Sequence, residues 1–363
     1  MNRRDILKGA GVATAAALTG PFFHIRPARA DKGELVVVSW GGDYDTALRE
    51  HVFPAFEKAT GYSLKLDAPP ETAKVKAMVQ SGNVSWDVIM TDTPAVQALL
   101  KDNLLEPIDY AAVDSAKLGR IPKELQQRYA LGQRIYSFNI VYNTNLMPKS
   151  KHPRNWAEVW DGKAFPGGRT FNFQGGIAPQ LEAALLADGV PLDKLYPLDI
   201  ERAWRAMDRL RPLVTKWYTS HAQAIQLLSA GEVAVGNTIG PRGISAKKAG
   251  APVDVDYNQG KLASDNWCLV KGVRNKKVAM EFINMALDPK VQAQIAQKVP
   301  YGPSNTGAFE FLSPQEAADL ATSPENIKNQ FWWNTDWWST PGPDGKTPRE
   351  SQGERFTKWM LNT

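Results

Sequence analysis

The chain has 363 residues, a formal net charge of +5 and a single cysteine, Cys268. The first 30 residues carry four of the five net positive charges, so the rest of the chain is nearly neutral. That balance removes the main support for a nucleic-acid-binding function. One cysteine cannot form an internal disulfide, and its apolar surroundings predict a buried structural thiol.

Residues 1–30 have the layout of an export signal. A basic start with Arg3 and Arg4 precedes a short apolar run and the small-x-small pattern ARA at 28–30. The start resembles a twin-arginine signal, and the alternative is an ordinary secretory signal with two adjacent arginines. Either signal predicts a periplasmic mature protein. We see no later segment that is apolar enough to anchor the chain in a membrane.

Strand-like and helix-like patterns alternate over the first hundred residues of the mature chain. They comprise a strand at 34–40, a helix at 46–61, a strand at 62–68, a helix at 72–82, a strand at 86–92 and a helix at 93–109. This alternation predicts an open α/β sheet. Ligands bind such sheets beyond the carboxyl ends of the strands, which favours the loop at 40–45 and the residues at 92–93.

The extended segment 134–148 is too long for the sheet of one modest domain, and a second extended segment, 249–272, would return the chain to the first lobe. We interpret them as crossings between two lobes, a layout that produces a hinged cleft. The expected division is a first lobe of 31–136 plus 270–363 and a second lobe of 137–269.

Several short motifs, in this order, resemble the periplasmic solute-binding proteins of ABC transporters, in the group that includes spermidine/putrescine-binding proteins. The motifs are SWGGDYDTALREHVFPAFEKATG, SGNVSWDVIMTD, LLEPIDY, FPGGRTF, ALLADGVPLDKLYPLD, WCLVKG and YGPSN. The resemblance implies a two-lobed α/β fold of the type II periplasmic-binding-protein kind, with a ligand cleft between lobes joined by extended hinge crossings. It also implies capture of a small-molecule solute, delivery to an ABC transporter permease in the inner membrane, and no catalysis. We expect a monomer without a cofactor or a metal.

The same resemblance implies a set of ligand contacts. They are Trp40, Tyr44, Asp92 and Thr93 in the first lobe, Gln174 and Gly175 in the second, Asp265 in the second crossing, and Tyr301. In polyamine-binding relatives a carboxylate at the position of Asp265 holds an ammonium group.

One loop departs from the polyamine pattern. The sequence NTIGPRGI brings Arg242 to a place where a cation-binding wall would have an aromatic ring, and Ala263 replaces an expected tryptophan. A buried or half-buried guanidinium is costly unless an anion meets it, and an arginine would repel a polycation. Placed opposite Asp265, Arg242 would bind a ligand carboxylate. The hypothesis is therefore a small cationic or zwitterionic solute, such as an ω-amino acid or a betaine, with a polyamine as the alternative.

Most of these residues also have a structural explanation. Arg242 would pair with a helix carbonyl or a structural acid, Asp265 would belong to a turn, and Asp92 would cap the next helix. Trp40 would pack under the first helix, and the aromatic cluster at 330–339 favours lobe packing over a ligand platform.

An exported hydrolase or lyase on the same scaffold is a remote alternative. The histidines are scattered without metal-ligand spacing, and no serine lies in a nucleophile motif. The close pairs Asp43/Asp45 and Asp254/Asp256 are interpreted as surface charge rather than as glycosidase carboxylates.

Overall fold

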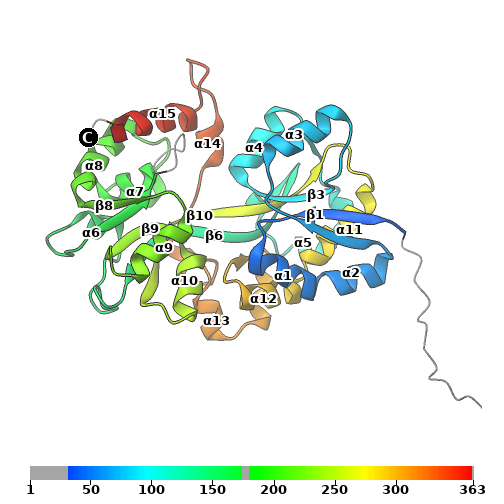
Figure 1. Ribbon diagram of the computed structural model, residues 1–363, viewed down its shortest axis with the longest axis horizontal. Coiled ribbons are helices and arrows are strands. Elements are labelled where there is room, and N and C mark those ends of the chain that lie inside the picture. Colours follow the sequence, from blue (N-terminus) through cyan, green and yellow to red (C-terminus); the bar gives the residue numbers. More distant parts are fainter. Residues whose placement is uncertain (1–31, 174–179, 362–363) are drawn as a thin grey trace, which may run out of the picture.

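A computed structural model describes residues 32–173 and 180–361 (Figure 1). The signal at 1–30 and the expected contacts Gln174 and Gly175 lie outside these residues. The expected alternation at the start of the mature chain is confirmed. Its elements are β1 (Glu34–Val38), α1 (Gly42–His51), α2 (Phe53–Thr60), β2 (Ser63–Asp67), α3 (Thr72–Ser81), β3 (Val88–Asp92) and α4 (Thr93–Lys101).

Two of the expected helices have different limits. The helix expected over 46–61 is divided into α1 and α2, because Pro54 in the first turn of α2 has no N–H to continue the earlier helix. Gly61 ends α2 in the left-handed conformation, at a φ of 75°, as its position suggested. The helix expected over 93–109 ends already at Lys101, and Asn103 follows it with a φ of 54°.

The two predicted crossings are the longest strands of the molecule, β6 (Ala130–Asn143) and β10 (Val253–Val270). They pair antiparallel over most of their length and run from one lobe into the other (Figure 1). The second lobe contains α6 (Trp156–Trp160), β7 (Arg169–Asn172), α7 (Leu181–Ala187), α8 (Ile200–Leu210), β8 (Val214–Tyr218), α9 (His221–Ser229), β9 (Val235–Ile239) and α10 (Gly240–Lys248).

After β10 the chain forms α11 (Lys276–Ala286) and α12 (Pro289–Lys298) in the first lobe. Shorter elements follow or connect these: β4 (Leu105–Glu106), α5 (Ser115–Leu118), β5 (Gln126–Gln127), β11 (Gly302–Pro303), α13 (Pro314–Ala318), β12 (Phe331–Trp332) and α14 (Thr335–Ser339). The last described element is the long helix α15 (Pro348–Leu361). The main strands form one sheet through both lobes, in the order β2-β1-β3-β10-β6-β9-β7-β8.

The first lobe has a core on each face of its sheet. Trp267 and Leu269 of β10 pack on one face, while Cys268 and Val270 pack on the other. A strand that is covered on both faces is apolar at every position rather than at alternate ones. The prediction that Cys268 is a buried thiol is confirmed.

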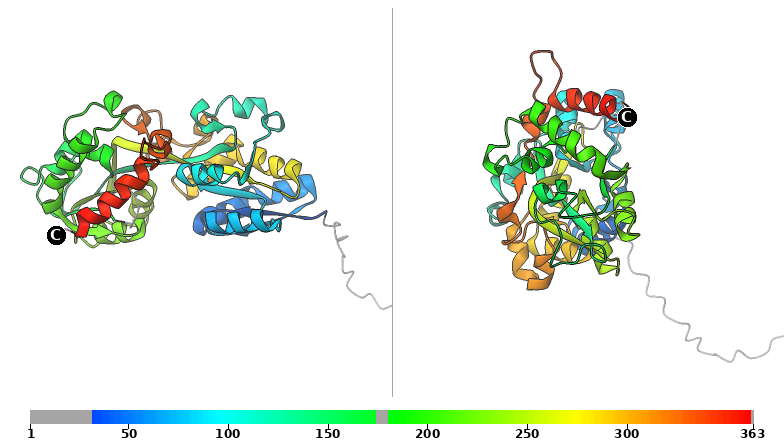
Figure 2. Two further views of the ribbon diagram at one scale, coloured as in Figure 1. Left: turned by 90° about the horizontal axis from the view of Figure 1, so that it is seen from above. Right: turned by 90° about the vertical axis from the view of Figure 1, so that its left-hand side faces the viewer.

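The end of the chain corrects the expected domain division. Trp338 of α14 and Phe356 of α15 lie in the main core of the second lobe, together with Trp204 of α8. Both views in Figure 2 show α15 lying along that lobe. The division that placed all of 270–363 in the first lobe is therefore wrong for this segment. The aromatic residues at the end of the chain cover apolar surface of the second lobe, as the favoured packing interpretation of the cluster implied.

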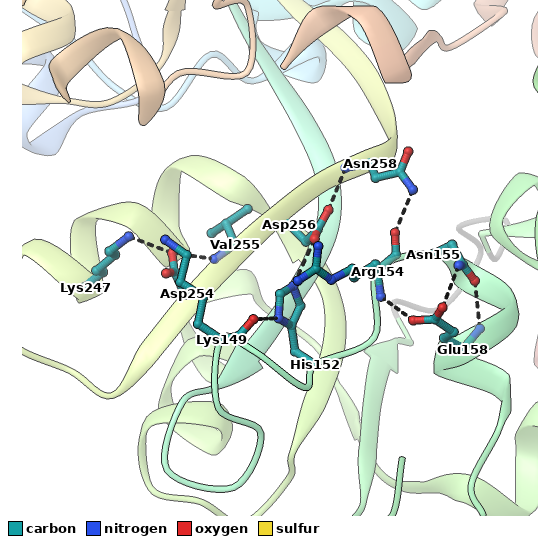
Figure 3. Close-up of polar contacts among 10 residues, drawn as sticks. All are labelled: Lys149, His152, Arg154, Asn155, Glu158, Lys247, Asp254, Val255, Asp256 and Asn258. Carbon is teal, nitrogen blue, oxygen red and sulfur yellow. Dashed lines mark hydrogen bonds and ion pairs between the residues drawn. The ribbon is translucent and has the colours of Figure 1, made fainter. Parts of the chain in front are cut away.

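Asp254 and Asp256 are not free surface charges. The Lys247 ammonium lies 2.7 Å from Asp254 Oδ1, and the Nε2 atom of His152 lies 2.9 Å from Asp256 Oδ2 (Figure 3). Lys149 contributes its carbonyl oxygen, 2.9 Å from Nδ1 of the same histidine. Both carboxylates thus hold neighbouring segments of the second lobe to β10.

Candidate functional site

A cavity of about 370 Å³ lies between the lobes, where the paired strands β6 and β10 pass from one lobe into the other. The first lobe contributes Trp40 and Asp92 to its lining, and the second contributes His221 and Arg242. The loop after β1, the end of β3 and the start of α10 therefore meet at one place. This is the arrangement that the carboxyl-end rule for α/β sheets leads one to expect.

The crossing strands supply much of the cavity wall through side chains on one face of the sheet. Arg134, Tyr136 and Phe138 of β6 all line the cavity, and so do Lys261 and Asp265 of β10. Alternate residues of a strand point to the same face of the sheet, which explains this spacing.

Asp265 forms a buried ion pair inside the cavity wall. The Nε atom of Arg134 donates to Asp265 Oδ2 at 2.7 Å, and both side chains are nearly inaccessible. The Arg134 guanidinium also lies between two tyrosine rings, 4.2 Å from the centroid of Tyr44 and 3.9 Å from that of Tyr301. Asp265 is thus neither a turn residue nor an isolated carboxylate, and Arg134 balances its charge.

Asp92 stands directly opposite Asp265, because the two residues are register partners in the antiparallel pairing of β3 with β10. Its carboxylate accepts a hydrogen bond from the backbone N–H of Ala95 at 2.8 Å and so caps α4. Burial and the nearby charge of Asp265 raise the pKa of Asp92, although the Ala95 hydrogen bond opposes that shift. Asp92 therefore both caps a helix and lines the cavity.

A second buried ion pair lies at the other end of the wall. Glu182 of α7 is 1% exposed, and its Oε2 atom accepts a hydrogen bond from the Lys261 ammonium at 3.1 Å. Its Oε1 atom accepts from Tyr196 at 2.6 Å and from the Trp338 indole at 2.8 Å. The ammonium also lies 4.6 Å from the ring centroid of Trp333. Glu182 thus neutralises the only lysine of the cavity wall among the described residues.

Two arginines of the cavity wall lack such a partner. Arg242 lies in the first turn of α10, and Arg349 lies in the first turn of α15. Among the described residues, no carboxylate oxygen lies within 4.0 Å of either guanidinium. Arg242 is exposed toward the cleft, so the expectation that its guanidinium is buried or half-buried is wrong. Its structural explanation, an ion pair with a protein acid, finds no support among these residues.

Five of the residues predicted from the sequence line this cavity: Trp40, Asp92, Arg242, Asp265 and Tyr301. Trp40 is 43% exposed, so it faces the cleft and does not pack under the first helix.

Two predicted residues lie outside the cavity lining. Tyr44 is buried beneath the Arg134 guanidinium. The Thr93 hydroxyl is 3.3 Å from Ser264 Oγ and accepts a hydrogen bond from Asn266 at 3.2 Å. Tyr44 therefore supports Arg134 of the wall from behind, whereas Thr93 bonds to the two neighbours of Asp265 in β10.

Nine residues of the wall were not predicted from the sequence, namely Arg134, Tyr136, Phe138, Asn172, Gln180, His221, Ile239, Lys261 and Arg349. Trp333 and Trp338 of the cluster at 330–339, for which lobe packing was favoured, line the cavity as well. Two polar atoms of the wall also have no hydrogen-bond partner among the described residues, the indole nitrogen of Trp333 and Oδ1 of Asn172. Buried polar groups are usually paired, so these two atoms point to a polar ligand or to water.

His221 is neutral near neutral pH. Burial and the adjacent positive charge of Arg242 lower the pKa of His221 to about 4. Its Nδ1 atom lies 2.8 Å from the Thr238 hydroxyl. The histidine therefore adds no charge to the cavity wall, whose charges belong to the arginines, Lys261 and the carboxylates.

This shift predicts an acid-dependent loss of stability. An unfolded histidine has a pKa near 6.5, so the unfolded chain binds more protons than the folded protein between about pH 6.5 and pH 4. The contribution of His221 is fully present above this window and is lost as the pH falls through it. We expect the free energy of unfolding, measured with urea, to decrease more steeply over this window in the wild type than in His221→Gln. Equal slopes would contradict the shift.

The described residues contain no group of three or more His, Cys, Asp or Glu side chains placed to hold a metal ion. Within the same residues, no helix has the length and apolar character needed to cross a membrane.

The family model for bacterial extracellular solute-binding proteins matches residues 52–325. The chain belongs to this family. The family's members capture small solutes and work with membrane permeases of ABC transporters, so the resemblance inferred from the motifs is confirmed. A model of the twin-arginine translocation signal matches residues 1–20, which confirms the export signal and the periplasmic location of this binding protein.

Individual relatives align with most of the length of this binding protein. It is 30% identical to the gamma-aminobutyric acid-binding protein of Pseudomonas aeruginosa, over 92% of each chain. It is 26% identical to the spermidine/putrescine-binding periplasmic protein of Escherichia coli, over 69% of this chain and 73% of the relative. The solved structure of the Atu4243 GABA receptor superposes with a TM-score of 0.78 and 31% identity, covering 90% of this chain and 97% of the receptor. The predicted two-lobed fold is thereby confirmed.

Proposed function

We propose that this binding protein captures a small amino-acid-type solute through its carboxylate and passes it unchanged, as a monomer, to its permease. The observation that carries the proposal is Arg242, a guanidinium that faces the cavity without a protein carboxylate. An arginine in this state is suited to bidentate binding of a ligand carboxylate. Relatives named for γ-aminobutyrate support the same solute class.

The other end of such a ligand would meet the two carboxylates of the wall. Asp92 and Asp265 are cross-strand partners, and the Cβ atoms of such partners are about 5 Å apart. Asp265 already balances Arg134, so the charge of Asp92 is the one left for an ammonium group. Tyr136 and Trp40 line the same space and supply aromatic faces for the ligand chain.

Capture requires both lobes. Asp92 and Trp40 come from the first lobe, whereas Arg242 comes from the second. A ligand that contacts both sets stabilises the closed arrangement, and the permease would distinguish it from the open one. The sequence predicts that Gln174 and Gly175 add contacts from the second lobe, and this stays a prediction.

A polyamine is the second candidate, because the cavity contains two acids and several aromatic rings, and because polyamine-binding relatives match the chain. Four cationic side chains argue against it. Arg134, Lys261, Arg242 and Arg349 outnumber the carboxylates of the wall, and a polycation would meet a net positive surface.

A titration of the mature protein separates the candidates. We expect calorimetry to detect binding of γ-aminobutyrate and not of spermidine, together with a ligand-dependent rise in melting temperature. Mass spectrometry of the released ligand should show an unchanged compound, and light scattering should give a monomer mass. Binding of spermidine alone would refute the amino-acid proposal, and a converted ligand would favour the hydrolase or lyase alternative.

A further inference from the structure

The charges of the cavity do not balance. The wall carries four cations, Arg134, Arg242, Lys261 and Arg349, against the carboxylates Asp92 and Asp265. Glu182 behind the wall supplies one further negative charge, through its bond to Lys261. Residues 174–179, QGGIAP, contain no ionisable side chain and cannot alter this count. A simple zwitterion would leave one positive charge unmatched, and a ligand with one net negative charge would match it.

Arg349 is the cation left over once Arg242 binds the carboxylate of the proposed function. It is half-buried, lines the cavity, and its Cζ atom lies 5.6 Å from the ring centroid of Trp333. The neighbouring acid in the chain, Glu350, is engaged elsewhere, because its Oε2 atom accepts a hydrogen bond from the Thr347 N–H at 2.8 Å. The same interaction fixes the first turn of α15 and so holds Arg349 at the cavity.

Arg349 also interacts electrostatically with Asp92. Burial lowers the pKa of Arg349, and the negative charge of Asp92 opposes that shift. The two groups are nevertheless not an ion pair, since no oxygen of Asp92 lies within 4.0 Å of the guanidinium among the contacts of the described residues. A carboxylate and a guanidinium that line one cavity and influence each other electrostatically without forming an ion pair can receive the ammonium and the carboxylate of one carbon atom.

We propose that the cavity binds an amino dicarboxylate, with its α-amino-acid group between Asp92 and Arg349 and its far carboxylate on Arg242. This inference rests on the proposed function, because it keeps Arg242 as the site of the far carboxylate and adds a second anion site at Arg349. The side chains of the wall then have no unmatched charge.

Two matched pairs of probes test the inference. L-glutamate is γ-aminobutyrate with one added carboxylate, and L-α-aminoadipate is δ-aminovalerate with the same addition. In calorimetry of the mature wild type, we expect at least one dicarboxylate to bind about tenfold or more tightly than its monocarboxylate partner, which corresponds to one well-placed charged contact. In Arg349→Gln the ratio within the pair should fall close to one.

Lys358→Ala removes a positive charge from an exposed position of the same helix, outside the cavity wall, and should preserve the wild-type ratio. A wild-type ratio near one in both pairs would overturn the inference while leaving the proposed function intact. Equal weakening of both members of a pair in Arg349→Gln would also overturn the inference. It would show that Arg349 forms an ion pair with Asp92 when the lobes close, because such a pair would affect the binding of every ligand equally. Binding of none of the four probes, or of spermidine alone, would overturn the proposed function together with the inference.

Discussion

Replacing Arg242 with alanine should weaken binding of the carboxylate ligand by about 2–5 kcal/mol, the usual result of truncating one partner of a desolvated charge pair. Arg242 is exposed in the free cleft, and closure of the lobes on the ligand would take the pair out of water. The loss should be large because Arg242 makes no ion pair with a described protein residue, so its partner is the ligand. For the same reason the melting temperature of the ligand-free protein should hardly change. Calorimetric titration of γ-aminobutyrate, with thermal unfolding of the free protein, measures both effects.

Two control variants make this result specific. Arg242→Lys keeps the charge but loses the planar fork of the guanidinium, so it should recover only part of the affinity. Arg205→Ala removes an exposed arginine of the second lobe that does not line the cavity, and it should bind like the wild type. Wild-type affinity in Arg242→Ala, or an equal loss in Arg205→Ala, would refute the role given to Arg242.

Replacing Glu182 with glutamine should destabilise the fold by about 3–5 kcal/mol, because it leaves the buried ammonium of Lys261 without its counter-charge. Glutamine can still accept the hydrogen bonds from Tyr196 and Trp338, so the change isolates the ion pair. Urea unfolding of the ligand-free protein measures the effect.

The double variant Glu182→Gln/Lys261→Met provides the matched test. It removes both charges at once, and a buried ion pair replaced by uncharged side chains of similar size usually costs little. We therefore expect the double variant to be more stable than Glu182→Gln alone. Glu201→Gln, at an exposed ion pair with Arg355, should leave the unfolding midpoint nearly unchanged. A double variant less stable than the single one would show that hydrogen bonding, and not charge, governs this position.

The sequence predicted the parts of the fold that follow from local patterns. The strands β1 and β3 were visible because burial on both faces produces short apolar runs, and helix-like patterns separate them. The strands β6 and β10 were visible through the length of their extended segments. The sequence of β6 also contains a pattern that indicates part of the cavity wall. Arg134, Tyr136 and Phe138 occur at every second position, which places them on one face of the sheet, and that spacing could have identified them as a wall.

Other parts of the site depend on contacts between distant segments. Lys261 meets Glu182 across 79 residues of sequence, and no periodicity or motif relates the two positions. Arg349 reaches the cavity only because the last helix packs on the second lobe. The sequence could not show whether Arg242 pairs with a protein acid for the same reason, since its neighbours come from distant segments of the chain.

The packing of α14 and α15 also has a consequence for the order of synthesis. The main strands of the second lobe have all left the ribosome once β10 is made, yet Trp338 and Phe356 are still to come. A nascent or truncated chain that ends before β12 therefore exposes the apolar surface around Trp204. The second lobe can therefore complete its core only after α14 and α15 have been made, so a finished binding cleft requires the segment that carries these two helices.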